Sequence, residues 1–466
     1  IEILVRMVGS TGAPTAAQEL KVLDRVARAE ARNADIAANE VAVIDAVAKM
    51  VADGSIAVSD EVSSESMRKV RNALFAAAGE SALSVSDSEL TPPEARAVAE
   101  KAYRSSFDLG LLLRWFALFT RYRYVLSEQL VDDYRRQAFK PALLCPALID
   151  YDFWLGQYVD DTPLPDQVTV MGRVARRTSG PVVHGYVAFD PLRQVAHDLG
   201  HARQFDPLAL VDRAIREEGF LGVKLYPPMG FRAIGNADEC QTYPDLQIIR
   251  AIADSAVDEG AYDHCSPRPI EGSLVVGRKL DGAMERLFDL CVKHDACVMA
   301  HANNSNGSNE AYGKRADPAY WVGVFRRWPS LRVSLAHFGS FDSISAGSQT
   351  QSLPVGSWEW TLGRYLKEQP GAPVFADISF LTEIAGQSAE ELAKYPGIVR
   401  RWIQEFDPGY EHLLFGSDWL MLGADAAYQG YTQRIATFFR NSVGLDDVRM
   451  ARLFRVNSAR FLGLRV

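Results

Sequence analysis

Short apolar runs that end in polar or acidic residues recur along the last two-thirds of the chain. In one of them, HLLFGSDW at positions 412–419, the apolar residues give way to Ser417 and Asp418. A parallel strand covered on both faces is apolar throughout, so the point where it turns polar marks where it leaves the core. Four upstream runs share the pattern, at positions 222–226, 296–301, 331–337 and 374–379. The polar residues at or near the ends of these five predicted strands are, in chain order, Lys224, His301, His337, the pair Asp377 and Ser379, and Asp418.

Two further strands and a series of helices are predicted from the same kind of pattern. The strands cover positions 142–152 and 182–191, although Pro146 is unusual in the middle of a sheet. Helical spacing of apolar residues occurs at positions 207–218, 280–294, 319–328, 356–368, 390–405 and 428–441. Strands that alternate with helices favour right-handed crossovers and a parallel sheet. We therefore predict an α/β fold, a (β/α)8 barrel of the TIM type, with seven strands countable and strand 1 lacking in this chain.

The first 140 residues have a different, helical pattern. Positions 16–52 are rich in helix-forming residues without Gly or Pro between Ala16 and Ala52, and a second helix is predicted at 66–78. A hydroxyl cap, Thr91, followed by two prolines and Glu94, predicts the start of a third helix that runs past Tyr124. This part contains no His and no Cys. We therefore expect residues 1–140 to form a helical cap or an insertion between barrel strands 1 and 2, and residues 141–466 to form the (β/α) barrel.

Charge and cysteine content narrow the class of partner. The chain has 466 residues and a net charge of −9, with no block of Lys and Arg, which argues against a nucleic-acid or anionic-membrane partner. The most apolar window, 109–119, contains Arg114 and is shorter than the roughly 20 residues that a bilayer needs. The five cysteines are scattered without a C-x-x-C pair, which indicates reduced thiols in a cytoplasmic protein. The expected partner is a small-molecule substrate, and homo-oligomer formation is left open.

The strand-end residues predict a metal site. In a parallel barrel all strands end at one face, so His301, His337 and Asp418 are expected to converge there. Imidazole and carboxylate suit Zn²⁺ foremost, with Mn²⁺ or Fe²⁺ as alternatives. A metal ion at an open site lowers the pKa of a bound water or polarises a carbonyl group. Asp418 is expected both to bind the metal and to take the proton from the attacking water.

The order of these motifs resembles the amidohydrolase superfamily, in particular the amidohydrolase-related branch that includes aminocarboxymuconate semialdehyde decarboxylase. GVKLYPP is similar to strand 4 of that family, VMAHANN to strand 5, VSLAHFGSF to strand 6, VFADISF to strand 7 and LLFGSDW to strand 8. The closing segment FRVNSARFLGL is similar to the helix with which the branch ends. The resemblance begins at Ala142 and does not extend to the helical first third. It implies a (β/α)8 barrel that uses a divalent metal.

The resemblance also implies roles for individual residues. His301 would be a metal ligand, Asp418 a metal ligand or general base, and His337 a second ligand or a group that acts on the substrate. Lys224 would occupy the position of a carboxylated, metal-bridging lysine, or would be a charge that orients the substrate. The neighbours expected to line the pocket are Tyr226, Arg232, Asn303, Ser417 and Trp419, with Arg232 as the clamp for a substrate carboxylate.

The chain departs from the family pattern because it contains no H-x-H pair. In one interpretation strand 1 lies upstream of Ile1 and residues 1–140 are an insertion. In a second, Asp150 and Asp152 replace the pair and an extra strand lies at 274–277. In a third, residues 1–8 form a degenerate strand 1 without an ordinary metal site. The pair His197 and His201 is a further zinc candidate, but it lacks the Glu of an H-E-x-x-H motif.

Three functions from different classes follow from these interpretations. The first is metal-dependent hydrolysis of a small-molecule amide, lactone or ester. The second is metal-dependent, non-oxidative decarboxylation of an unsaturated or aromatic acid on the same scaffold. The third is a non-catalytic barrel that binds a small molecule or a partner, which is favoured if Leu4 and Arg6 of a degenerate strand 1 occupy the positions of the two histidines.

Overall fold

The structure is a computed structural model of the chain. The residues that it describes are 13–27, 115, 118–119, 121–156, 162–178, 180–258, 274–304, 309–341, 353–386, 388–423, 428 and 430–465. The chain divides into two compact units, one made of residues 1–133 and 419–429 and the other of residues 134–418 and 430–466. The division at residue 140 that the sequence suggested stays a prediction. Within the described part, no helix combines the length and the apolar character needed to cross a bilayer.

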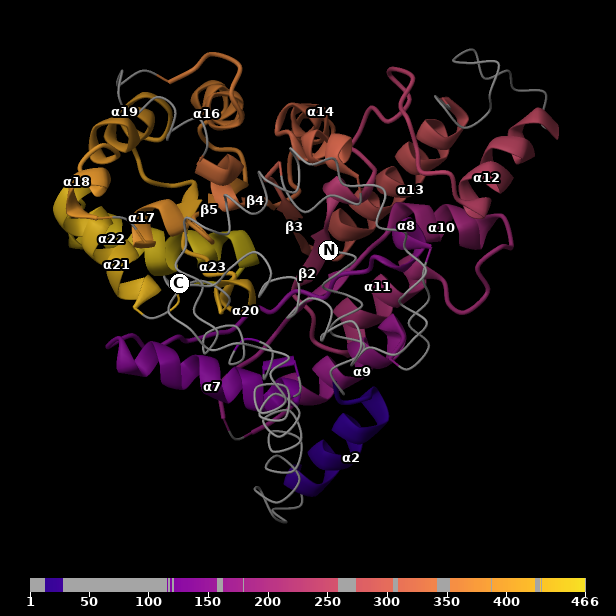
Figure 1. Ribbon diagram of the computed structural model, residues 1–466, viewed down its shortest axis with the longest axis horizontal. Coiled ribbons are helices and arrows are strands. Elements are labelled where there is room, and N and C mark those ends of the chain that lie inside the picture. The colour runs from indigo at the N-terminus through magenta and orange to yellow at the C-terminus, as the bar shows by residue number, and fades with distance from the viewer. Residues whose placement is uncertain are drawn as a thin grey trace, which may run out of the picture. The chain divides into compact units, whose positions relative to one another are not determined.

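The second unit contains a parallel sheet whose strands follow chain order (Figure 1). Its strands are β1 (Tyr186–Ala188), β2 (Gly222–Leu225), β3 (Cys297–His301), β4 (Val333–Ala336), β5 (Val374–Asp377) and β6 (Leu413–Leu414). Single parallel bridges join Leu144 to Val183 and Ala147 to Tyr186, so a seventh segment lies beside β1. The parallel α/β prediction is confirmed, and this order is consistent with a TIM barrel. Residues 1–8, the site of a possible degenerate first strand, lie outside the described residues.

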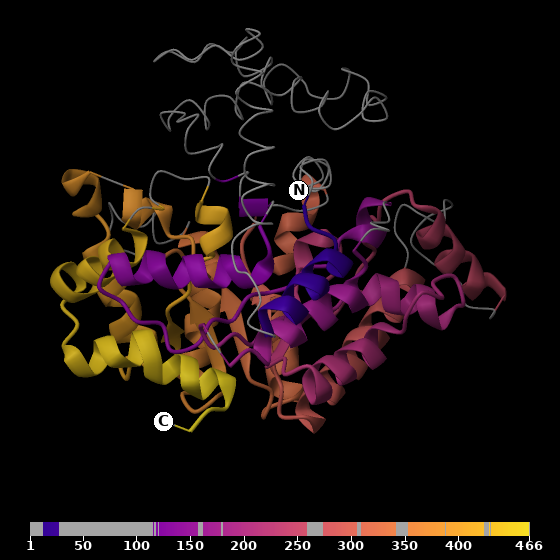
Figure 2. The same ribbon diagram turned by 90° about the horizontal axis from the view of Figure 1, so that it is seen from below.

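Helices connect the strands and lie around the outside of the sheet (Figures 1 and 2). Before β3 these are α8 (Asp152–Leu155), α9 (Leu164–Ala175), α10 (Pro191–Asp198), α11 (Pro207–Glu217), α12 (Gln247–Asp258) and α13 (Leu274–Lys293). Between β3 and β6 they are α14 (Ala319–Arg327), α16 (Trp358–Glu368), α17 (Thr382–Gly386), α18 (Ala389–Leu392) and α19 (Pro396–Phe406). After β6 they include α21 (Tyr431–Thr437), α22 (Asp447–Ala451) and α23 (Asn457–Leu462).

Helices of the N-terminal third are described only in part. Helix α2 (Ala16–Ala27) covers the start of the helix expected at 16–52. The helix that contains Tyr124 is α7 (Arg123–Arg136), which begins at Arg123 after two non-helical residues, 121 and 122. The helices expected at 66–78 and after Thr91 fall outside the described residues.

Aromatic and aliphatic side chains fill the space enclosed by the strands. Tyr186, Cys297, Phe375 and Leu414, from four different strands, form one buried cluster with Phe461 of α23. The Phe461 ring lies 6.2 Å from that of Tyr186 and 5.7 Å from that of Phe375, measured between centroids. Apolar side chains therefore fill this part of the interior, and polar chemistry is expected where the strands finish.

Two alternatives raised by the sequence are wrong. Residues 274–277 form the first turn of α13 and no strand, so the extra strand of the second interpretation is absent there. Cys240 is disulfide-bonded, whereas Cys145, Cys291 and Cys297 are free. The expectation of reduced thiols fails at Cys240 because the spacing of cysteines along the chain does not reveal which of them meet in space.

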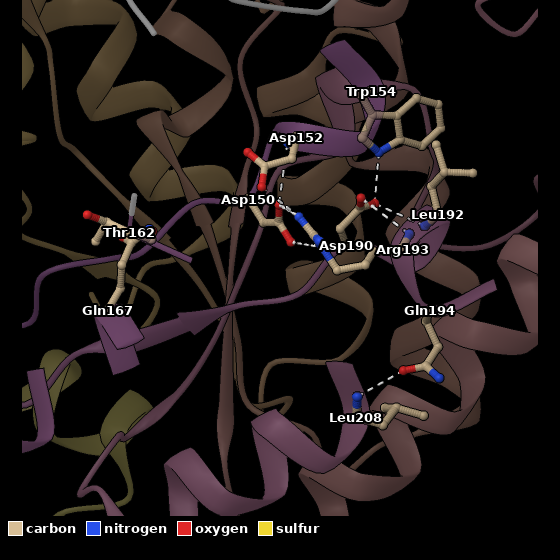
Figure 3. A network of polar contacts seen from close by, with 10 residues as sticks. All are labelled: Asp150, Asp152, Trp154, Thr162, Gln167, Asp190, Leu192, Arg193, Gln194 and Leu208. Atoms are coloured by element: carbon tan, nitrogen blue, oxygen red, sulfur yellow. Dashed lines mark hydrogen bonds and ion pairs between the residues drawn. The ribbon is translucent and has the colours of Figure 1, made fainter. Parts of the chain in front are cut away.

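Asp150 and Asp152, the pair that the second interpretation assigned to metal binding, are instead bound by Arg193 (Figure 3). Arg193 Nε and Nη2 donate to the two carboxylate oxygens of Asp150 over 2.6 and 2.7 Å, and Nη2 also donates to Asp152 over 2.8 Å. The guanidinium group lies 4.5 Å from the centroid of the Phe153 ring. We call Arg193, Asp150 and Asp152 the Arg193 clasp. It ties the segment that follows residue 147 to the start of α10.

Asp190 caps α10 beside the clasp. Its carboxylate accepts hydrogen bonds from the backbone N–H groups of Leu192 and Arg193 and, over 2.8 Å, from Trp154 Nε1. Burial, followed by the charge of Asp150, raises the pKa of Asp190 from 3.8 to about 7, although Arg193 opposes the shift. A carboxyl group with a raised pKa in the folded state stabilises the fold in its protonated form.

The pH dependence of stability tests this assignment. The contribution of Asp190 should be complete below pH 3.8 and lost as pH rises through about 7, because the unfolded chain releases the proton first. The unfolding free energy should therefore fall between pH 4 and 7, by at most about 1.4 kcal/mol per pH unit from this group. Denaturant unfolding of Asp190→Asn should lack this part of the slope. Asp206→Asn, which alters the matching cap of α11, is the control and should keep it.

Candidate active site

The ends of β2 to β6 bring five polar side chains into one region. Lys224 lies on β2, His301 ends β3, His337 directly follows β4, Asp377 ends β5 and Asp418 follows β6. The rings of His301 and His337 meet edge to face, with centroids 4.7 Å apart. His337, Lys224 and Asp377 are close enough to shift the pKa of Asp418. The structure thus brings together the two imidazoles, the carboxylate and the lysine singled out in the sequence.

His301 is a buried, neutral imidazole with one unused nitrogen. Its ring stacks on that of Tyr226 with centroids 4.3 Å apart. Burial, and then the neighbouring charges of His337 and Lys224, hold its pKa well below the ordinary value. The backbone of Asn303 hydrogen-bonds to the ring, and Nε2 is buried without a hydrogen-bond partner among the described residues. The Asn303 contact therefore uses Nδ1, which leaves the lone pair of Nε2 available to a ligand.

His337 is oriented by Asp377 through Ser379. The Ser379 hydroxyl group donates to Asp377 Oδ1, and its oxygen lies 2.9 Å from His337 Nδ1. Because the single hydroxyl proton is used toward Asp377, the oxygen must accept a hydrogen bond from Nδ1–H. We infer that His337 carries its proton on Nδ1, so its Nε2, like that of His301, offers a lone pair.

Two of these residues have unusual backbone conformations. His337 has φ 70° and Asp418 has φ 52°, in the left-handed region that side chains other than glycine disfavour. The backbone N–H of His337 donates to Asp377 Oδ1 over 3.1 Å, which helps to hold this conformation. Strained backbone that the surrounding structure maintains tends to occur at functional sites. His337 and Asp418 are two of the seven described non-glycine residues with positive φ, and both belong to the site.

Lys224 and Asp418 have pKa values shifted toward neutrality. Burial lowers the pKa of Lys224, while the carboxylates of Asp377 and Asp418 oppose the shift. Desolvation by the surrounding protein raises the pKa of Asp418, while the positive charges of His337 and Lys224 oppose the shift. Asp418 nevertheless keeps much of its surface exposed to solvent, so it can meet a substrate or water. Opposed acid and base groups with shifted pKa values are typical of catalytic sites.

The donor set fits a metal ion in part. The free Nε2 of His301 and the lone pair inferred for His337 suit a zinc-like ion, and Asp418 adds a carboxylate. Across the described residues, however, no three His, Cys, Asp or Glu side chains are already gathered closely enough to hold an ion. The roles of His301, His337, Asp418 and Lys224 in metal binding therefore stay predictions.

The expected substrate-binding residues are less uniformly placed. Tyr226 lies against His301, and Asn303 contacts the same ring through its backbone. The guanidinium group of Arg232 is already paired with Glu239 and lies 4.2 Å from the centroid of the Tyr320 ring. It is therefore not a free clamp for a carboxylate.

Two other expected pocket residues have partners of their own. Trp419 belongs to the first unit, where its Nε1 donates to Asp133 over 3.1 Å. Ser417, in the second unit, hydrogen-bonds to Tyr134. Their contribution to a pocket stays a prediction.

Sequence reasoning missed two groups that the structure places here. Asp377 and Ser379 were recognised only as a polar pair at the end of a predicted strand, although their spacing of two puts both on one side. Tyr151 was not singled out at all. Its ring meets that of Tyr226 edge to face, with centroids 5.5 Å apart. The available signal was its position near the end of the predicted strand at 142–152, between two acids.

Comparison with known proteins gives a family match. A family model described as amidohydrolase matches residues 202–464, which is more than half of the chain. A search of curated proteins finds no match.

Several solved structures are similar to parts of the chain. An amidohydrolase from Burkholderia multivorans with bound HEPES has 14% identity, covers 75% of this chain and 92% of its own, and gives a TM-score of 0.40. 5-Carboxyvanillate decarboxylase from Sphingomonas paucimobilis has 13% identity. The match covers 79% of this chain and 96% of the decarboxylase, with a TM-score of 0.40. 4-Oxalomesaconate hydratase from Rhodopseudomonas palustris has 13% identity. The match covers 64% of this chain and 71% of the hydratase, with a TM-score of 0.35.

The proton position on His337 can be checked directly. In protein with ¹⁵N-labelled histidine at neutral pH, the Nδ1 of His337 should give the shift of a protonated nitrogen and Nε2 that of an unprotonated one. Ser379→Ala removes the acceptor, so the population with the proton on Nε2 should rise. Ser334→Ala is the control, because Ser334 is also buried on this sheet but its hydroxyl group has no partner among the described residues. A wild-type spectrum with the proton on Nε2 would contradict the inference.

Proposed function

The chain belongs to the amidohydrolase family, and from this premise we propose that it is a metal-dependent hydrolase of a small-molecule amide, lactone or ester. The observation that carries the proposal is the edge-to-face pair of His301 and His337, 4.7 Å apart, each with Nε2 left as a lone-pair donor. Two such donors beside a carboxylate at the strand ends are what a hydrolytic metal site requires.

His301 and His337 would hold the metal, which we propose to be Zn²⁺, with Mn²⁺ or Fe²⁺ as alternatives. When bound, a divalent ion polarises a substrate carbonyl group and lowers the pKa of water. Asn303 would fix the ring of His301, and Ser379 that of His337, because each binds Nδ1 and so turns Nε2 toward the ion.

Asp418 would act as the general base. Its exposed carboxyl group can reach a water molecule, and the surrounding protein raises its pKa, which makes it a better proton acceptor than an ordinary aspartate. Lys224 would hold the substrate oxygen or an acidic group of the substrate nearby. Its position between Asp377 and Asp418 keeps it within reach of both carboxylates.

Decarboxylation is the second candidate, and Lys224 is the observation that favours it. The residue is buried, and its positive charge lies near the carboxylates of Asp377 and Asp418. A buried cation of this kind would suit a substrate with a carboxylate group. A decarboxylase would use the same imidazoles to orient the substrate but would need no water activated by Asp418.

Substitution of Asp418 tests the proposal and separates the candidates. The zinc-loaded wild type should hold zinc in elemental analysis and hydrolyse some members of a panel of p-nitrophenyl esters, lactones and N-acyl amino acids. Asp418→Asn should lower kcat by roughly 10²–10⁴-fold with unchanged thermal unfolding, since general-base catalysis contributes about this much. Asp447→Asn, at an exposed position of α22, is the matched control and should keep full activity.

The contrary outcomes are distinct. Release of CO2 from aromatic or unsaturated acids without hydrolysis would favour the decarboxylase. A wild type that binds no transition metal would favour the non-catalytic barrel and would remove both enzymatic proposals.

A further inference from the structure

Tyr151 lies beside the candidate site and has no role in the function proposed above. It follows the segment that pairs with β1 and directly precedes α8. Its ring meets Tyr226 edge to face, and Tyr226 in turn stacks on His301 at 4.3 Å. Three rings from three different strand ends therefore form one continuous wall.

The side chain of Tyr151 lies against Tyr226 and near Asp418. It hydrogen-bonds to Tyr226 and is close enough to Asp418 for the two to influence each other electrostatically. A phenol is an O–H donor at neutral pH. Asp418 is the proposed general base for the attacking water. The substrate oxygen beside that water would therefore lie near the Tyr151 donor.

The Arg193 clasp fixes the backbone on both sides of Tyr151. Arg193 binds Asp150, the preceding residue, through two hydrogen bonds, and Asp152, the following residue, through a third (Figure 3). The guanidinium group is buried, and Phe153 and Phe205 lie over it at 4.5 and 4.9 Å from their centroids. Bidentate pairing fixes orientation as well as position, which a lysine at this site would not reproduce.

We propose that Tyr151 donates a hydrogen bond to the substrate oxygen that becomes negatively charged, and that Arg193 is the positioning residue that holds Tyr151 in place. The inference rests on the proposed hydrolytic function and deepens it, because it assigns the substrate oxygen a neutral donor on the same wall as His301. A donor already in position lowers the energy of a developing oxyanion without reorganisation. When the hydroxyl group turns to the substrate, it loses its hydrogen bond to Tyr226 and gains one to the substrate oxygen.

Binding of a small oxyanion tests the donor without requiring turnover. Acetohydroxamate, whose oxygen atoms bind zinc, should bind the zinc-loaded wild type in isothermal titration calorimetry. Tyr151→Phe should raise its Kd by about 10- to 100-fold, the effect of one lost hydrogen bond to a charged group. Tyr243→Phe, at a buried tyrosine beside Arg315, is the control and should leave Kd unchanged. Equal affinity of wild type and Tyr151→Phe would overturn the assignment of Tyr151.

The clasp is tested independently of metal and ligand. A ¹⁹F label introduced as 3-fluorotyrosine at position 151 should give a sharp resonance that moves and broadens in Arg193→Lys. In Arg286→Lys, which alters an exposed ion pair with Asp198, it should not change. An unchanged resonance in Arg193→Lys would overturn the positioning role.

These two readouts separate the failures. If the wild type binds no zinc, the proposed function and the oxyanion role of Tyr151 fall together, and the fluorine spectrum alone decides whether the clasp positions Tyr151. If zinc and acetohydroxamate bind normally in Tyr151→Phe, the proposed function stands and the donor role falls.

Discussion

The parallel pairing of neighbouring strands in chain order is the constraint on which the site depends. Each strand runs the same way, so residues that are far apart along the chain finish at one edge of the sheet. His301 and His337 meet because β3 and β4 are hydrogen-bonded neighbours in register from Val298 to His301. The buried cluster around Phe461 fills the interior between the strands with apolar side chains, so polar groups are expected at this edge.

Asp377 connects the strand framework to the chemistry. One of its carboxylate oxygens accepts hydrogen bonds from the backbone of His337, the backbone of Ser379 and the Ser379 hydroxyl group. These contacts fix the strained backbone of His337, the orientation of its ring and the position of its proton. Without Asp377, the imidazole would be free to rotate and to exchange its proton between the two nitrogens.

The sequence predicted the strands well because buried parallel strands are apolar runs, and their ends carried Lys224, His301 and His337. It could not predict contacts that depend on the fold as a whole. Arg193 lies in an ordinary amphipathic helix, and only the fold shows that it binds the acids that flank Tyr151. The disulfide at Cys240 was missed for the same reason, since spacing along the chain carries no information on proximity across a loop. The helical N-terminal third stays largely a prediction, because most of it lies outside the described residues.

Diffraction at the zinc absorption edge, from crystals grown with zinc, tests the central claim that the two imidazoles form one metal-binding site. The account predicts an anomalous peak about 2.0–2.1 Å from Nε2 of both His301 and His337, with the carboxyl group of Asp418 beside it. A peak bound to neither imidazole, or imidazole rings whose Nε2 atoms point away from each other in the zinc-loaded crystal, would contradict it.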